Sequence, residues 1–174
     1  LTTGTIAIGA YALQESIGNT DYTVAIGYKA LQGQYNSEPL GVFIGGFAGM
    51  TASSSYESVM IGHKSGQYGG VSNAGRSQTF VGYQSGQYAT GSNNTFVGSS
   101  AGKGGNSSAP FSSGQFNVAV GYNASCSNTS GTRNVAVGDS GLRSNTTASY
   151  NTALGFDTLS TNTKVKFNIT VGVN

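Results

Sequence analysis

The chain has 174 residues, of which 37% are hydrophobic, only 8% are charged and 28 are glycine, and its formal net charge is +2. Ten tyrosines, eight phenylalanines and many β-branched residues argue against disorder, because disordered chains are usually charged and poor in aromatic residues. The basic residues form no cluster, and no apolar run approaches the roughly 20 residues of a membrane span, so we expect neither nucleic-acid binding nor membrane insertion.

A motif of the form aliphatic-x-aliphatic-Gly recurs from one end of the chain to the other. Successive glycines are 18, 18, 17, 20, 16, 23, 17, 17 and 17 residues apart. A fixed period of this size is the mark of a repeat architecture. We therefore predict that residues 1–174 form a single all-β domain, a β-solenoid of about ten coils, and that it is a fragment of a longer fibre. The structural repeat glycines are Gly9, Gly27, Gly45, Gly62, Gly82, Gly98, Gly121, Gly138, Gly155 and Gly172.

The three residues before each glycine predict a short strand. Residues two apart share one face of a strand, and β-branched side chains favour that conformation. We expect a second strand after the glycine, which would give two strands per coil. The residues three before the glycine are, in chain order, Ile6, Val24, Val42, Val59, Thr79, Thr95, Val118, Val135, Thr152 and Ile169. Those one before it are Ile8, Ile26, Ile44, Ile61, Val81, Val97, Val120, Val137, Leu154 and Val171.

The residue between these two columns varies together with the residue four after the glycine. Where the first is Phe or Met the second is Gly, as in Phe80 and Gly86. Where the first is Ala the second is Leu, as in Ala136 and Leu142, with Ser125 as the one intermediate. This volume compensation predicts that the two positions share one packing space.

Three further columns support stacking of the repeats. Small residues stand three after the glycine, where they would permit close approach of backbones. Five asparagines stand four before it in the second half, and stacked asparagines can form a hydrogen-bonded ladder. They are Asn94, Asn117, Asn134, Asn151 and Asn168. A partial aromatic row follows the glycine and consists of Tyr28, His63, Tyr83, Tyr122 and Phe156.

The residues that could carry chemistry form no catalytic or metal-binding motif, so we expect no enzyme, no cofactor and no metal. We interpret His63 as a substitute in the aromatic row and Cys126 as a small residue in a polar turn. A polysaccharide-degrading activity would need paired acids, for which only Asp139 and Asp157, in consecutive repeats, qualify. An acyltransferase would need a period of six, and an ice-binding protein would need a uniform threonine column. The acids are Glu15, Asp21, Glu38, Glu57, Asp139 and Asp157.

The long gaps between repeats, residues 33–41, 67–78 and 103–116, are where we expect recognition. Insertions in a solenoid map to loops on one face, which is often the binding face. Exposed aromatic residues and arginine dominate binding energy. The candidate receptor-binding residues are Tyr35, Tyr68, Arg76 and Phe111.

The stretches "NTALGFDTLSTNT", "NNTFVGSSAG", "NVAVGYNAS" and "TVAIGYKAL" resemble the N-T-A-L-G-Y-x-A-L repeats of bacteriophage tail-fibre proteins. They are also similar to the S-V-A-I-G repeats in the heads of YadA-like trimeric autotransporter adhesins. Either resemblance implies a left-handed parallel β-roll, a homotrimer, and attachment to a host surface glycan or protein receptor, in a virion tail fibre or at a cell surface. The repeat period of 16 to 18 fits the tail-fibre version better, and other fibre or virion proteins would then be partners.

Self-association also has a physical argument. A thin coil leaves apolar columns at its surface, and stacked repeats with large apolar faces need partners. We expect columns of Phe, Tyr and Ala to lie on that surface. The number three is implied by the resemblance.

Overall fold

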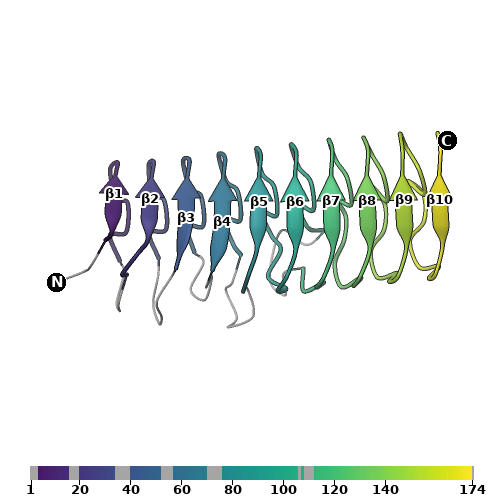
Figure 1. The fold of residues 1–174 in the computed structure, drawn as a ribbon, viewed down its shortest axis with the longest axis horizontal. Helices are drawn as coiled ribbons and strands as arrows, with labels where there is room; N and C mark the ends of the chain where they lie inside the picture. Colours follow the sequence, from purple (N-terminus) through teal and green to yellow (C-terminus); the bar gives the residue numbers. More distant parts are fainter. Residues whose placement is uncertain are drawn as a thin grey trace.

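The computed structural model describes residues 4–15, 20–33, 40–51, 57–69, 76–105, 107 and 112–173. Ten parallel strands form one sheet, in which strands that are neighbours in the chain are also neighbours in space (Figure 1). The predicted strands are confirmed, and the fold is an all-β solenoid. The strands are β1 (Ile6–Ile8), β2 (Val24–Ile26), β3 (Gly41–Ile44), β4 (Ser58–Ile61), β5 (Thr79–Val81), β6 (Thr95–Val97), β7 (Val118–Val120), β8 (Val135–Val137), β9 (Thr152–Leu154) and β10 (Ile169–Val171).

The register of the sheet places equivalent residues of successive repeats beside each other. Phe43 of β3 pairs with Ala25 of β2 on one side and with Met60 of β4 on the other. The parallel ladder continues one residue beyond each strand, since the Gly45 N–H donates to the Ile26 carbonyl at 2.7 Å. The columns of the sequence are therefore rows of contacts along the solenoid.

The prediction of a second strand in each coil is wrong. The chain after each glycine forms a turn segment in which the second and fourth residues are left-handed, as with Lys29 (φ 55°) and Leu31 (φ 49°). The Lys29 N–H donates to Ala10 of the preceding repeat at 3.0 Å, and the Leu31 N–H donates to Ala48 of the following repeat at 2.9 Å. Residues other than glycine rarely adopt this left-handed backbone conformation. The apolar pattern of the sequence alone therefore does not reveal the turn segment.

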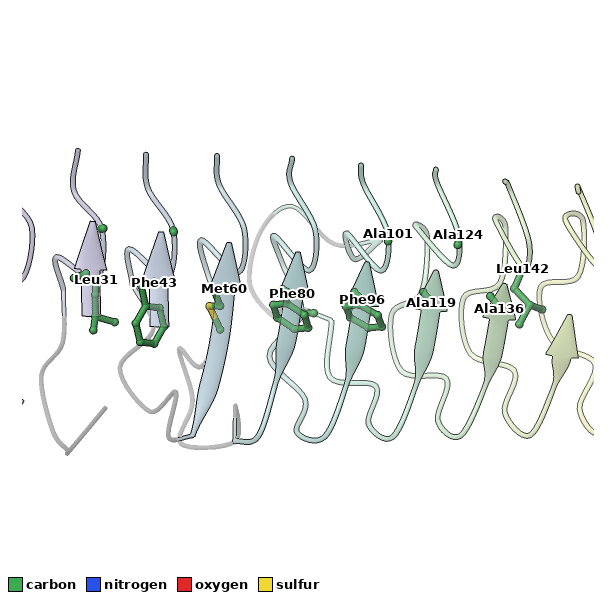
Figure 2. Close-up of a cluster of buried hydrophobic side chains, with 14 of the residues drawn as sticks. Leu31, Phe43, Met60, Phe80, Phe96, Ala101, Ala119, Ala124, Ala136 and Leu142 are labelled. Atoms are coloured by element: carbon green, nitrogen blue, oxygen red, sulfur yellow. The ribbon is translucent and has the colours of Figure 1, made fainter. Parts of the chain in front are cut away.

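The middle residue of each strand faces the interior. Phe43, Met60 and Phe80 are fully buried, and Figure 2 shows them in a row along the solenoid axis. The Phe80 and Phe96 rings stack with their centroids 5.0 Å apart. The expectation that the Phe and Ala columns lie on the surface is therefore wrong. Because side chains alternate along a strand, the β-branched residues on either side face outward instead.

The predicted sharing of one interior space is confirmed. A Cβ atom built on Gly86 would lie 2.5 Å from Cε2 of Phe80, and one on Gly49 would lie 2.6 Å from Cδ1 of Phe43. Such separations leave no room for a side chain. In the alanine repeats the fourth residue after the glycine fills the space, and Leu142 there is fully buried.

The repeat glycines are required for two reasons. Their φ angles lie between 123° and 142°, a region that other residues rarely adopt. They also stack directly on one another: a Cβ on Gly27 would lie 2.6 Å from the carbonyl oxygen of Gly45. The glycine column is the line along which successive backbones approach most closely.

The asparagine ladder of the second half is also confirmed. The Oδ1 atom of each asparagine accepts the backbone N–H of the asparagine in the next repeat. The distance from the Asn117 backbone N to Asn94 Oδ1 is 2.9 Å. The corresponding distance is 3.0 Å for each of the donors Asn134, Asn151 and Asn168. The Nδ2 group of Asn134 donates sideways to the Ala148 carbonyl at 2.8 Å. The ladder thus pairs polar groups inside the solenoid that would otherwise be costly to bury.

Candidate functional site

The two acids of consecutive repeats, Asp139 and Asp157, are joined by a backbone hydrogen bond. The Asp157 N–H donates to the Asp139 carbonyl at 2.8 Å, and the Asp139 carboxylate accepts the Ser140 hydroxyl at 2.7 Å. Within the described ranges, no group of three or more His, Cys, Asp or Glu side chains could hold a metal ion. The part of the chain that the structure describes also contains no helix long and apolar enough to span a bilayer.

Two of the four candidate receptor-binding residues, Tyr68 and Arg76, lie among the described residues. Tyr35 and Phe111 lie outside the described residues. Tyr68 is half-buried and stacks on Tyr88 with ring centroids 5.4 Å apart. Arg76 is exposed in the approach to β5, where its backbone N–H donates to the Ser92 hydroxyl at 3.3 Å. Their role in recognition remains a prediction.

Part of the longest insertion belongs to the solenoid itself. Ser112 is 3% exposed and forms an isolated parallel bridge with Ala89. The Thr90 N–H donates to the Ser112 carbonyl at 2.7 Å, and Asn94 Nδ2 donates to the Gly114 carbonyl at 2.9 Å. Removing these residues would break the interior ladder, so the far end of this insertion is structural.

The outward face of the sheet is largely aliphatic, with Thr79, Thr95 and Thr152 among its members. It consists of the columns one and three residues before each glycine, and we call it the aliphatic face. In the middle of the stack Val97 and Val135 are each 36% exposed, and Leu154 is 45% exposed. Exposed apolar surface of this extent is typical of an interaction site.

A second surface feature is a row of aromatic rings across the turns that follow β1 to β5, which we call the aromatic row. Neighbouring ring centroids lie between 5.3 and 5.9 Å apart. The first three contacts are edge-to-face, and the His63 and Tyr83 rings are stacked. His63 is exposed between two aromatic neighbours, as the sequence predicted. The row consists of Tyr11, Tyr28, Phe47, His63 and Tyr83.

Sequence reasoning missed two members of this row. Tyr11 and Phe47 stand two residues after their glycines, whereas Tyr28, His63 and Tyr83 stand one residue after theirs. A single column therefore shows only part of the row. The available signal was that, from the first repeat to the fifth, every glycine has an aromatic residue one or two positions after it.

A shallow depression of about 280 Å³ adjoins the aromatic row in the first three repeats. Lys29 belongs to both features, since its Nζ lies 5.8 Å from the Tyr11 ring centroid and 5.6 Å from that of Tyr28. The Gln32 side chain donates to the Gln14 side chain at 3.2 Å beside it. The depression is lined by Glu15, Lys29, Gln32, Gly33, Met50 and Thr51.

A second, smaller aromatic column lies before the C-terminal strands. The Arg133 guanidinium carbon lies 5.1 Å from the Phe116 ring centroid and 5.6 Å from that of Tyr150, and its Nη1 donates to the Tyr150 hydroxyl at 3.2 Å. Tyr150 in turn stacks on Phe167 at 5.0 Å. The rings of Phe116, Tyr150 and Phe167 are all exposed.

Comparison of the chain with family models, with curated proteins and with solved structures gives no match in any of the three.

Proposed function

We propose that this chain is a structural segment of a phage-type tail fibre that attaches to a host cell surface, and that it acts as a homotrimer of left-handed rolls. Its partners are then two further copies of itself, neighbouring fibre or virion proteins and a host receptor. The resemblance of its repeats to tail-fibre repeats supports this function. The observation that carries the assembly is the exposed aliphatic face.

The size of the aliphatic face supports its burial in an assembly. Ten strands about 4.8 Å apart extend about 45 Å, and the outward columns with their border are about 15 Å wide. The resulting area of about 700 Å² is close to the roughly 800 Å² that each partner buries in a standard two-partner interface, so a trimer that divides this face between two copies would need further contacts beside it. Turning this face toward a threefold axis parallel to the solenoid would bury it against both other copies.

The interior supports a mechanical role rather than a chemical one. Stacked glycines, the asparagine ladder and the shared interior space connect each repeat only to its neighbours, as in other solenoids. Such a stack gives length and rigidity, and repeating it lengthens a fibre without new chemistry.

The mass of the chain in solution, measured by sedimentation equilibrium at micromolar concentration, tests the assembly. We expect three times the 17.6 kDa of one chain. The double variant Val135→Lys with Leu154→Lys places two charges on the aliphatic face and should reduce the mass to that of one chain, because buried unpaired charges are costly.

Thr147→Lys provides the matched control, since Thr147 is exposed but lies outside the aliphatic face. This variant should keep the mass of the unmodified chain. A single-chain mass for the unmodified protein would contradict the proposed assembly. A loss of association that Thr147→Lys causes equally would contradict the assignment of the interface to the aliphatic face.

A further inference from the structure

We propose that the aromatic row and the adjoining depression form a binding site for a linear carbohydrate chain. This inference depends on the proposed function in one respect, that the protein attaches to a surface, and it assigns that attachment to described residues of the first five repeats. The site lies beyond the repeat glycines, on the turns, whereas the aliphatic face lies on the strands before them.

The geometry of the row suits a ligand that repeats along one direction. Five rings from five successive repeats follow each other at 5.3 to 5.9 Å. Tyr11, Tyr28 and Tyr83 are each about half exposed, at 49%, 45% and 51%. Edge-to-face contacts hold the rings in place before binding, so little side-chain freedom is lost when a ligand arrives. Pyranose rings present apolar C–H faces that pack on such aromatic surfaces.

The depression supplies the polar half of the same recognition. Sugar hydroxyl groups need both donors and acceptors, and Glu15, Lys29, Gln32 and Thr51 provide carboxylate, ammonium, amide and hydroxyl groups along one wall. Its volume of about 280 Å³ is just below the roughly 300–1,000 Å³ typical of small-molecule pockets. It can therefore take one sugar unit while neighbouring units lie along the aromatic row.

A carbohydrate fits these features better than a nucleic acid. Binding of a single strand requires a basic groove that follows the phosphates as well as aromatic rings. The described turns of the aromatic row carry only Lys29 and Lys64 as basic residues besides His63. In addition, the edge-to-face contacts occupy the spaces between the first rings, into which bases would have to stack.

The test is binding of the 174-residue chain to a broad array of bacterial and synthetic oligosaccharides and polysaccharides, followed by titration with the best one. We expect Tyr28→Ala to weaken binding at least about fivefold, since truncation of an aromatic anchor can cost more than about 1 kcal/mol. Lys29→Ala should weaken it by about threefold to tenfold, because it removes one polar contact.

Tyr122→Ala is the matched control. Tyr122 is 58% exposed at the same repeat position as Tyr28, but the adjacent turns carry Ser99 and Asp139 there, so it has no row to belong to. We expect this variant to bind the glycan like the unmodified chain. Thermal melts of all three variants check that the solenoid remains folded, and Tyr28→Phe, which retains the ring, should keep most of the affinity.

Three results would overturn the inference: no retention of any glycan on the array, equal binding by Tyr28→Ala and the unmodified chain, or tighter binding of oligothymidine than of any glycan. The outcome is separable from that of the assembly experiment. A chain that sediments as a single copy and still binds a glycan through Tyr28 contradicts the trimer and supports the site. A trimer that binds no glycan supports the proposed assembly and contradicts the carbohydrate site.

Discussion

The interior is filled in one way in the repeats of β3 to β6 and in another way in the alanine repeats of β1, β2, β7, β8 and β9. In the first group a Phe or Met from the strand fills the interior, and the turn opposite carries Gly. In the second group the strand carries Ala, and Leu fills the space from the turn in every repeat except that of β7, where the turn carries Ser125. The backbone is the same in both, since Gly86 (φ 57°) and Leu142 (φ 50°) are equally left-handed.

The magnitudes explain why both solutions are stable. A left-handed leucine costs about 1–2 kcal/mol of backbone strain. Full burial of its side chain contributes about 1.5–3 kcal/mol, which offsets that strain. The glycine repeats avoid the strain and obtain the burial from the Phe or Met of the strand. The comparison teaches that the backbone and the interior volume are constant along the solenoid, whereas the residue that fills the volume is not.

The largest loss of unfolding free energy is expected from a substitution that disturbs the stacked backbone, which is constant along the solenoid. One such position lies where the phenylalanine repeats give way to alanine repeats. Gly98 of the last phenylalanine repeat stacks on Gly121 of the alanine repeat that follows it, and a Cβ on Gly98 would lie 2.5 Å from the Gly121 carbonyl oxygen. Gly98→Ala combines this overlap with the strain of φ 132° and should cost at least about 3 kcal/mol of unfolding free energy.

Gly172→Ala separates the two contributions. Gly172 has a similar φ of 142°, but nothing lies within 4 Å of a Cβ built there. It should therefore cost only the conformational part, about 1–3 kcal/mol. Denaturant unfolding measures both, and equal losses for the two variants would show that the stacking of glycines does not limit the column.

A smaller effect is expected from the polar ladder, which distinguishes the second half from the first. Asn134→Ala leaves the Asn151 N–H without its partner inside the solenoid, while Asn145 Nδ2 still donates to the Ala148 carbonyl at 3.0 Å, and should cost about 1–3 kcal/mol. Asn168→Ala, at the half-exposed end of the ladder, should cost about 1 kcal/mol or less, because water can replace what is lost. Similar losses in chemical denaturation for the two variants would contradict a cooperative ladder.

Much of the solenoid could be predicted from the columns of the sequence. The strands, the shared interior space, the asparagine ladder and the exposed position of His63 follow from residue type and period alone. These features depend on contacts between equivalent positions, and a repeat displays the same contact many times. The volume compensation between the strand and turn positions, as in Phe80 and Gly86, is the clearest case.

Two features could not be predicted, for physical reasons. Leu31 and Leu142 adopt a left-handed conformation that leucine disfavours in isolation, so the turn segment resembled a strand in the sequence. The strands are apolar on both faces, and periodicity cannot decide which face is inside when both alternating sets are apolar. The inner face is identified by comparison with the turn. Only the middle residue of the strand, which is Phe, Met or Ala, changes in size together with the residue four after the glycine.

A double-mutant cycle on Phe80 and Gly86 tests whether the strand and turn positions share one interior space. Gly86→Leu and Phe80→Ala should each destabilise the protein by about 3 kcal/mol or more, the first through overlap and the second through a cavity. The combination recreates the alanine-and-leucine repeat and should be at least about 2 kcal/mol more stable than the sum of the single losses implies. Part of the loss should remain, because Phe80 also stacks on Phe96. Strictly additive losses in thermal or denaturant unfolding would contradict the account.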